Sequence, residues 1–151
     1  MSNIRNSQPP ISARPPQSET QPRKSAVLAD ADRQKLIRHL ASCEEARKPP
    51  SPFLGPVILR KIETSLPCGG EPPADAVIGG CLVTYSVGDG PARTGLLTHS
   101  ARKTVPGSGI IPVLSLLGAT LIGLRIGRTV PMLCEDGTVA RLTVLGVARP
   151  D

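Results

Sequence analysis

Hydrophobic positions in the first half of the chain recur with the spacing of helices. Residues 25–46 carry apolar side chains between charged ones, and Ser25 or Asp30 can cap the first turn. The apolar set of this first helix is Leu28, Leu36, Ile37 and Leu40. A proline-rich stretch at residues 49–52 ends it, because proline cannot continue a helix. The spacing of Leu54, Ile58 and Ile62 then predicts a second helix, which is regular over residues 56–64. The first and second helices form a short helical hairpin.

The second half changes to the period of strands. Apolar residues alternate over residues 81–87, and further strands are predicted at 92–101, 128–134 and 138–148, with turns at the intervening glycines. The most apolar stretch, residues 110–127, predicts a short helix that starts at Pro112 and ends at Gly123. Gly118 inside that helix indicates a close approach to a neighbour, here the sheet. This order predicts an α+β domain with a small antiparallel sheet and one packed helix.

Composition divides the chain further. Residues 1–24 contain five prolines and no aromatic residue, so we expect a disordered, basic, proline-rich tail. The hairpin is expected over residues 25–66, a Pro- and Gly-rich linker over 67–75, and the sheet domain over 76–151.

The formal charge of +6 favours either solubility or a polyanionic partner such as nucleic acid. Phe53 and Tyr85 are the aromatic residues of a chain without Trp, so base stacking is not expected. No two of the four cysteines have the C-x-x-C spacing of a zinc site, and we predict neither a metal nor a cofactor. We expect a monomer.

A membrane span is not expected in residues 110–127. Pro112, three glycines and Arg125 interrupt that stretch, whereas a spanning helix needs about 20 apolar residues. The polar N-terminus has no apolar core of a secretory signal, so the sequence predicts a cytoplasmic protein.

The stretch "GIIPVLSLLGATLIGLRIGRTV", followed by "EDGTVARLTVLGV", resembles the C-terminal domain of the bacterial Gre transcription elongation factors. The matching positions are Gly109, Ile111, Val113, Ser115, Gly118, Leu121, Gly123, Gly127 and Val130. With its short hairpin and linker, the whole chain looks most like the Rnk-like members of that family, the regulators of nucleoside diphosphate kinase. The sequence departs from the family pattern at Leu116, Thr120 and Arg128, where the family has proline, alanine and an acidic residue.

The resemblance implies an FKBP-like sheet domain that docks at the rim of the secondary channel of RNA polymerase. It places candidate docking residues at Ser115, Leu116, Leu117, Arg125 and Arg128. For the leucines the alternative is core packing, and for the arginines a solvated face. A prolyl isomerase, which the FKBP-like fold would allow, is not expected because such a pocket is aromatic.

In Gre factors a long coiled coil carries acidic residues that hold a catalytic magnesium ion for transcript cleavage. Here Glu44 and Glu45 lie near the hairpin tip, beside Arg47 and Lys48. Adjacent residues on a helix point about 100° apart, and the arms are short, so we expect no cleavage and no enzymatic activity. The predicted function is therefore a non-cleaving, RNA-polymerase-binding regulator that competes with Gre factors. The alternative is a charge-driven DNA-binding module, to which the basic tail would add weak nucleic-acid contacts.

Overall fold

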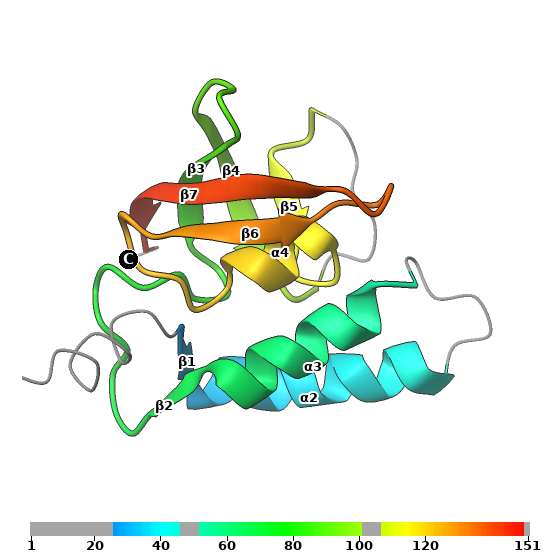
Figure 1. Ribbon diagram of the computed structural model, residues 1–151. Helices are drawn as coiled ribbons and strands as arrows, with labels where there is room; N and C mark the ends of the chain where they lie inside the picture. The colour runs from blue at the N-terminus through cyan, green and yellow to red at the C-terminus, as the bar shows by residue number, and fades with distance from the viewer. Residues whose placement is uncertain (1–25, 46–51, 101–106, 150–151) are drawn as a thin grey trace, which may run out of the picture.

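The computed structural model describes residues 26–45, 52–100 and 107–149. At its centre is a five-stranded sheet with the order β5-β4-β3-β7-β6 (Figure 1). The strands are β3 (Leu82–Val87), β4 (Arg93–Thr98), β5 (Ile110–Pro112), β6 (Thr129–Leu133) and β7 (Val139–Ala148). Every pair in this sheet is antiparallel except β4 and β5, which run parallel. The α+β prediction is confirmed, with the one parallel pair as a correction to a purely antiparallel sheet.

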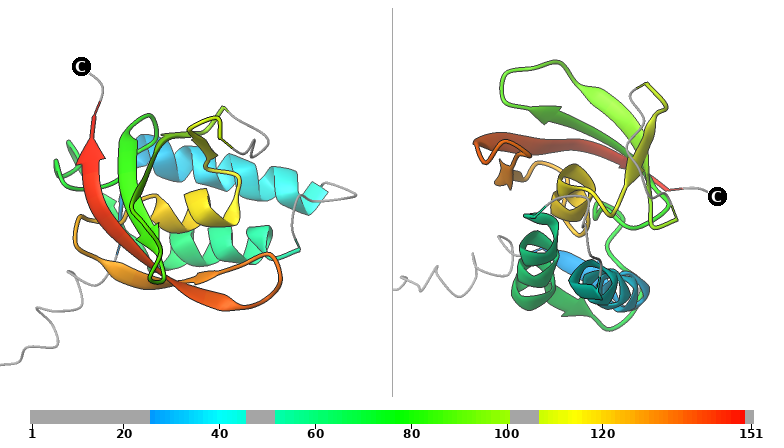
Figure 2. Two further views of the ribbon diagram at one scale, coloured as in Figure 1. Left: turned by 90° about the horizontal axis from the view of Figure 1, so that it is seen from above. Right: turned by 90° about the vertical axis from the view of Figure 1, so that its right-hand side faces the viewer.

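Three helices of the described residues lie on one side of this sheet. They are α2 (Asp30–Glu45), α3 (Leu54–Thr64) and α4 (Leu116–Leu121). Helices α2 and α3 lie side by side along the sheet domain, and α4 sits between α3 and the sheet (Figures 1 and 2). The hairpin therefore lies flat against the sheet domain.

A second, two-stranded sheet closes the base of the hairpin. Strand β1 (Val27–Ala29) pairs in parallel with β2 (Leu66–Cys68), and the amide of Val27 donates to the carbonyl oxygen of Gly123 at 2.9 Å. Of the two predicted starts of the first helix, Asp30 is confirmed, since α2 begins there. A start at Ser25 is wrong, because the chain is extended over β1, which contains Leu28. The extended backbone finds hydrogen-bond partners in β2 and in the residues that follow α4.

One hydrophobic core joins the two layers. The predicted α3 stripe is confirmed, with Leu54 and Ile58 fully buried and Ile62 8% exposed. These side chains belong to the same cluster as Val83 of β3 and Leu142 of β7. Leu36 is fully buried, as predicted for the apolar face of the first helix. The prediction that Ile37 shares this face is wrong, because Ile37 is 44% exposed. The shared core couples the hairpin to the sheet domain, while the division into units at residues 66 and 76 stays a prediction.

The apolar stretch at residues 110–127 holds a strand, a cap and a helix in succession. Its first residues form β5, Ser115 caps α4, and Gly123 follows the helix with a φ of +86°. The helix thus starts four residues after the predicted Pro112. The close approach predicted at Gly118 is confirmed, since a Cβ there would lie 1.9 Å from the carbonyl oxygen of Pro112. Across the described ranges, no helix is both long and apolar enough to span a membrane.

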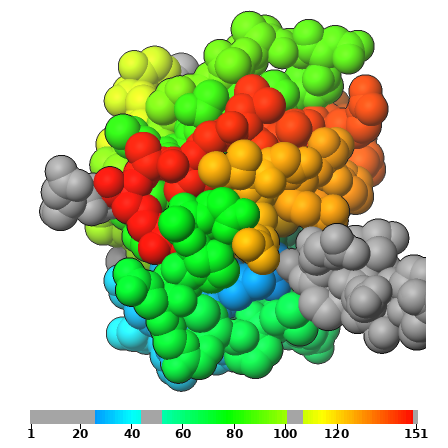
Figure 3. Space-filling view, turned by 90° about the vertical axis from the view of Figure 1, so that its left-hand side faces the viewer, coloured from blue at the N-terminus to red at the C-terminus, as the bar shows by residue number. Residues whose placement is uncertain are grey.

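The segment between β2 and β3 packs against the C-terminal end of β7. The guanidinium of Arg149 donates to the carbonyl oxygens of Pro72 and Pro73, and Figure 3 shows these green and red segments in contact. Ala76 forms a short antiparallel bridge with Arg125. These contacts bring the linker segment against both β7 and the turn that precedes β6.

Candidate docking groove and the predicted site residues

A cavity of about 710 Å³ opens where β5 leads into α4. It is bounded by β3, β4, β5, the start of α4 and the end of β6. The lining residues are Tyr85, Arg93, Thr94, Gly95, Gly107, Gly109, Ile110, Ile111, Pro112, Ser115, Leu116, Leu117, Met132, Leu133, Cys134 and Glu135. Three of the five predicted docking residues therefore share one groove, which we call the α4 groove.

The α4 groove has an apolar floor and a charged rim. Tyr85, Ile111 and Met132 are each less than 10% exposed and supply the floor. Arg93 and Glu135 are exposed at the rim. Cavities of this size and composition take apolar side chains or small molecules, with polar groups fixing orientation. A single aromatic ring, Tyr85, lines the groove, which does not resemble the aromatic cradle of a prolyl isomerase.

The three predicted residues at the start of α4 differ in their hydrogen bonds and in their exposure. The Ser115 hydroxyl donates to the Pro112 carbonyl at 2.7 Å and accepts from the Gly118 amide at 3.0 Å, so it serves the fold. Leu116 is 4% exposed and belongs to the core. Leu117 is half-buried and lines the groove. Of the three, Leu117 presents the most accessible apolar surface.

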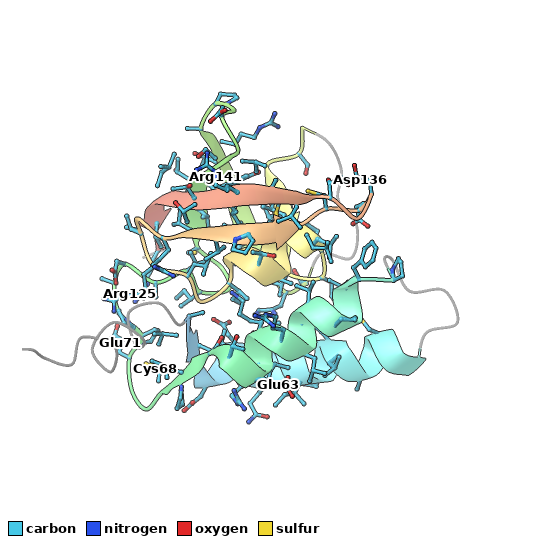
Figure 4. All side chains as sticks on the ribbon, viewed as in Figure 1. Glu63, Cys68, Glu71, Arg125, Asp136 and Arg141 are labelled. Carbon is cyan, nitrogen blue, oxygen red and sulfur yellow. The ribbon has the colours of Figure 1, made fainter. Side chains whose placement is uncertain are left out.

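Arg125 and Arg128 lie outside the α4 groove. The Arg125 guanidinium pairs with the Asp75 carboxylate, with Nε 3.1 Å from both oxygens and Nη2 3.0 Å from one. Figure 4 shows Arg125 at the opposite end of the molecule from Asp136, which follows the groove residue Glu135. Arg128 is half-buried just before β6. The five docking candidates thus do not form one surface.

The hairpin-tip candidates are described in part. Glu44 and Glu45 are the last two residues of α2, while Arg47 and Lys48 lie outside the described residues. Adjacent positions on a continuous helix are about 100° apart around its axis. That backbone arrangement does not favour one cation held by both residues. Among residues 26–45, 52–100 and 107–149, no three His, Cys, Asp or Glu side chains gather as metal ligands.

A polar network between α2 and the end of β4 was missed by sequence reasoning. Asp32 Oδ1 lies 2.9 Å from His99 Nε2, and His99 Nδ1 lies 3.1 Å from His39 Nε2. The Gly79 amide also donates to the Asp32 carboxylate, at 3.2 and 3.3 Å. These four residues are separated by up to 67 positions, and no short motif joins them. The glycine pair at 79–80 is the one local signal of this network in the sequence. A search for strand periodicity does not detect it.

A second missed feature is the amine of Lys61 at the α3–α4 interface. Its Nζ donates to the carbonyl oxygen of Thr120 at 2.8 Å. Burial lowers the pKa of Lys61 from 10.5 to about 7, because the ammonium loses its hydration there. The residue borders a cavity of about 580 Å³ lined mainly by apolar side chains. Its hydrogen bond to α4 ties the hairpin to the sheet domain.

No protein-family model matches the chain, and no curated protein matches its sequence. Among solved structures, a prokaryotic transcription elongation factor GreA/GreB from Nitrosomonas europaea is similar with a TM-score of 0.56 and 18% identity. The similarity covers 82% of this chain and 98% of that one. The two proteins share a fold. Because the coverage exceeds the sheet domain, the shared fold includes the helical hairpin.

Two further structures match with lower scores. Gfh1, a GreA factor homologue of Thermus thermophilus, has a TM-score of 0.40 at 13% identity and covers 82% of this chain and 98% of its own. Gfh1 of Thermus aquaticus has a TM-score of 0.42 at 15% identity, with coverage of 83% and 99%. Both of these TM-scores are below 0.5. The Rnk-like and FKBP-like assignments stay predictions.

Proposed function

We propose that this chain is a transcription regulator that binds RNA polymerase at the secondary channel without cleaving the transcript. The observation that carries the proposal is the fold shared with a GreA/GreB elongation factor over both hairpin and sheet domain. It agrees with the spaced glycine pattern of residues 109–130, which resembles the Gre C-terminal domain. In this proposal the protein acts as a cytoplasmic monomer and competes with Gre factors for the same site.

The hairpin geometry supports a role without chemistry. Helix α2 has 16 residues and α3 has 11, which correspond to about 24 and 16 Å at about 1.5 Å per residue. Both lie along the sheet domain and are fixed to it by Asp32–His99 and Lys61–Thr120. A hairpin held this close to the docking domain reaches no active site deep in a channel. It would instead obstruct the channel entrance.

The α4 groove supplies the docking surface in this proposal. Its apolar floor suits one or two apolar side chains of a helix or loop on the polymerase rim, and Arg93 and Glu135 can orient that segment. Arg125 and Arg128 stay secondary candidates, because Arg125 already pairs with Asp75 at another end of the molecule.

A charge-driven DNA-binding module is the second candidate, and the distribution of charge weakens it. Within residues 26–45, 52–100 and 107–149, ten Lys and Arg stand against ten Asp and Glu. The formal charge of +6 therefore resides entirely in the remaining segments. DNA binding would have to come from those segments, since the described part of the chain is neutral as a whole.

Co-purification with core RNA polymerase tests the proposal. The tagged full chain should retain polymerase at about 0.1 M salt, where ionic contacts are only partly screened, and an added Gre factor should release it. A transcript-cleavage assay on stalled complexes should show no stimulation by this protein. Absence of retention with the folded protein at low salt would sink the proposal. Retention on DNA without polymerase, lost at high salt, would favour the second candidate.

A further inference from the structure

A separate cavity of about 590 Å³ lies between α2 and the segment that follows β4. Its lining consists of basic, imidazole and hydroxyl side chains together with two glycines. The residues are Lys35, Arg38, His39, Ser42, Gly79, Gly80, Thr98, His99 and Ser100. No carboxylate is among the described residues that line it. We call it the α2 pocket.

Two cations stand at the opening of the α2 pocket. Lys35 and Arg38 are three residues apart on α2, so they share one face of the helix. Both side chains are exposed, and neither forms an ion pair with any residue in the described ranges. Ser42 extends the same face one turn further. An unpaired lysine and arginine beside a concave surface create a local positive potential on a part of the molecule that is neutral as a whole.

The wall of the α2 pocket is built by buried contacts. The rings of His39 and His99 stack with centroids 5.2 Å apart and planes at 19°. Behind them the buried Asp32 carboxylate accepts from His99 and from the Gly79 amide. Gly79 is required here, since a Cβ would lie 2.6 Å from His99 Cδ2. Because Asp32 lies behind the imidazole rings, they separate its negative charge from the pocket.

We propose that the α2 pocket binds a terminal phosphate group. Lys35 and Arg38 would neutralise the dianion, and the Ser42 and Ser100 hydroxyls would donate to its oxygens. No Phe, Tyr or Trp lines the pocket within the described ranges, so a nucleobase would find no stacking platform there. The ligand is thus recognised by its phosphate, whether this belongs to a small molecule or to the 5′ end of a nucleic acid.

Phosphate titration of the ¹⁵N-labelled full chain tests this proposal at constant ionic strength. The probes are inorganic phosphate, adenosine 5′-monophosphate, and one short oligonucleotide with either a 5′-phosphate or a 5′-hydroxyl. Saturable shifts are expected at the amides of Gly79, Gly80 and Ser100. The double variant Lys35→Gln/Arg38→Gln should bind at least about tenfold more weakly, since removing a charged hydrogen bond weakens binding about tenfold or more. The double variant Arg60→Gln/Arg141→Gln removes the same charge from exposed positions outside the pocket and should bind as the wild type does.

Each outcome decides for or against the pocket. Similar affinities for inorganic phosphate and the mononucleotide support recognition of the group alone. Tighter binding of the 5′-phosphorylated oligonucleotide than of its hydroxyl form also supports it and identifies a nucleic-acid end as the source. Equal binding of the two oligonucleotides, together with saturable binding of inorganic phosphate, supports a small molecule as the source. The proposal is overturned by equal weakening in both double variants or by no shift with millimolar phosphate. Because no polymerase is involved, failure here leaves the proposed function untouched.

Discussion

Lys61 Nζ lies 2.8 Å from the carbonyl oxygen of Thr120 and links the helical hairpin to the helix of the sheet domain. The hydrogen bond joins residues 59 positions apart across the interface of α3 with α4. The Lys61 amine is part-buried at this interface, where its ammonium form loses hydration. The hairpin and sheet domain are thus coupled by a group that titrates near neutral pH.

The free energy of unfolding should rise with pH above about 7 because of Lys61. The folded chain releases the Lys61 proton near pH 7, whereas the unfolded lysine keeps it until about 10.5. Between these values the unfolded state binds more protons, so folding is favoured as pH rises. A part-buried lysine gives a fraction of the limit of about 1.4 kcal/mol per pH unit. Urea unfolding at about pH 6, 7.5 and 9 measures this slope.

Lys61→Met should remove that part of the slope, and Lys35→Met should retain it. Lys35 is an exposed lysine on α2, so its replacement changes the charge equally without touching the interface. Identical slopes in the wild type and in Lys61→Met would show that the amine titrates alike in the folded and unfolded chains.

Gly118→Ala should destabilise the fold by about 3 kcal/mol or more. A Cβ at this position meets three backbone atoms within 3 Å, including the Pro112 oxygen at 1.9 Å, and backbone cannot move aside cheaply. The gain in helix propensity, about 1 kcal/mol, is smaller than this clash. Thermal and urea unfolding measure the change. Gly55→Ala in α3 is the matched control, since its Cβ would make an ordinary contact at 3.9 Å, and it should be neutral or slightly stabilising.

Several features of the fold could be predicted because the signal lies within a few residues. The i, i+4, i+8 spacing of Leu54, Ile58 and Ile62 reports a buried helical face, and all three are in the core. A glycine inside an apolar helix indicates a close approach, and Gly118 makes one. In the same way, the alternation of apolar and polar residues over β3 predicts which side of the strand is buried.

Other features could not be predicted, because they depend on partners far along the chain. Strand β1 is three residues long, too short for periodicity, and each of its residues pairs with one 39 positions away in β2. Likewise, Asp32, Gly79 and His99 meet only through the packing of α2 against the sheet domain. Of the predicted docking residues, the three at the start of α4 line one groove, and their role in docking stays a prediction. The separation of Arg125 from them required the three-dimensional structure.

Ser115→Ala should cost about 1 kcal/mol of stability, as is usual when an N-cap side chain is removed. The hydroxyl bonds both the Gly118 amide and the Pro112 carbonyl, so the variant leaves a donor and an acceptor without this partner. Ser115→Thr keeps the hydroxyl and should retain most of the stability. Equal unfolding midpoints for wild type and Ser115→Ala would contradict a capping role and make Ser115 a docking candidate again. Differential scanning calorimetry resolves a change of this size.

Leu117→Glu should weaken polymerase binding at least about tenfold. The substitution buries a charge in an apolar contact, which is unfavourable, and loss of an interface anchor costs about 2 kcal/mol or more of binding free energy. Leu117 is half-buried at the α4 groove, so the variant should fold. Leu145→Glu introduces the same charge on β7 outside the groove, at a leucine that is 47% exposed. Surface plasmon resonance with immobilised polymerase compares the two variants with the wild type. Weakened binding of Leu117→Glu with full binding of Leu145→Glu assigns docking to the groove. Equal affinities of all three proteins for polymerase would mean that the contact uses another face. The surface around Arg125 and Arg128 would then be tested next.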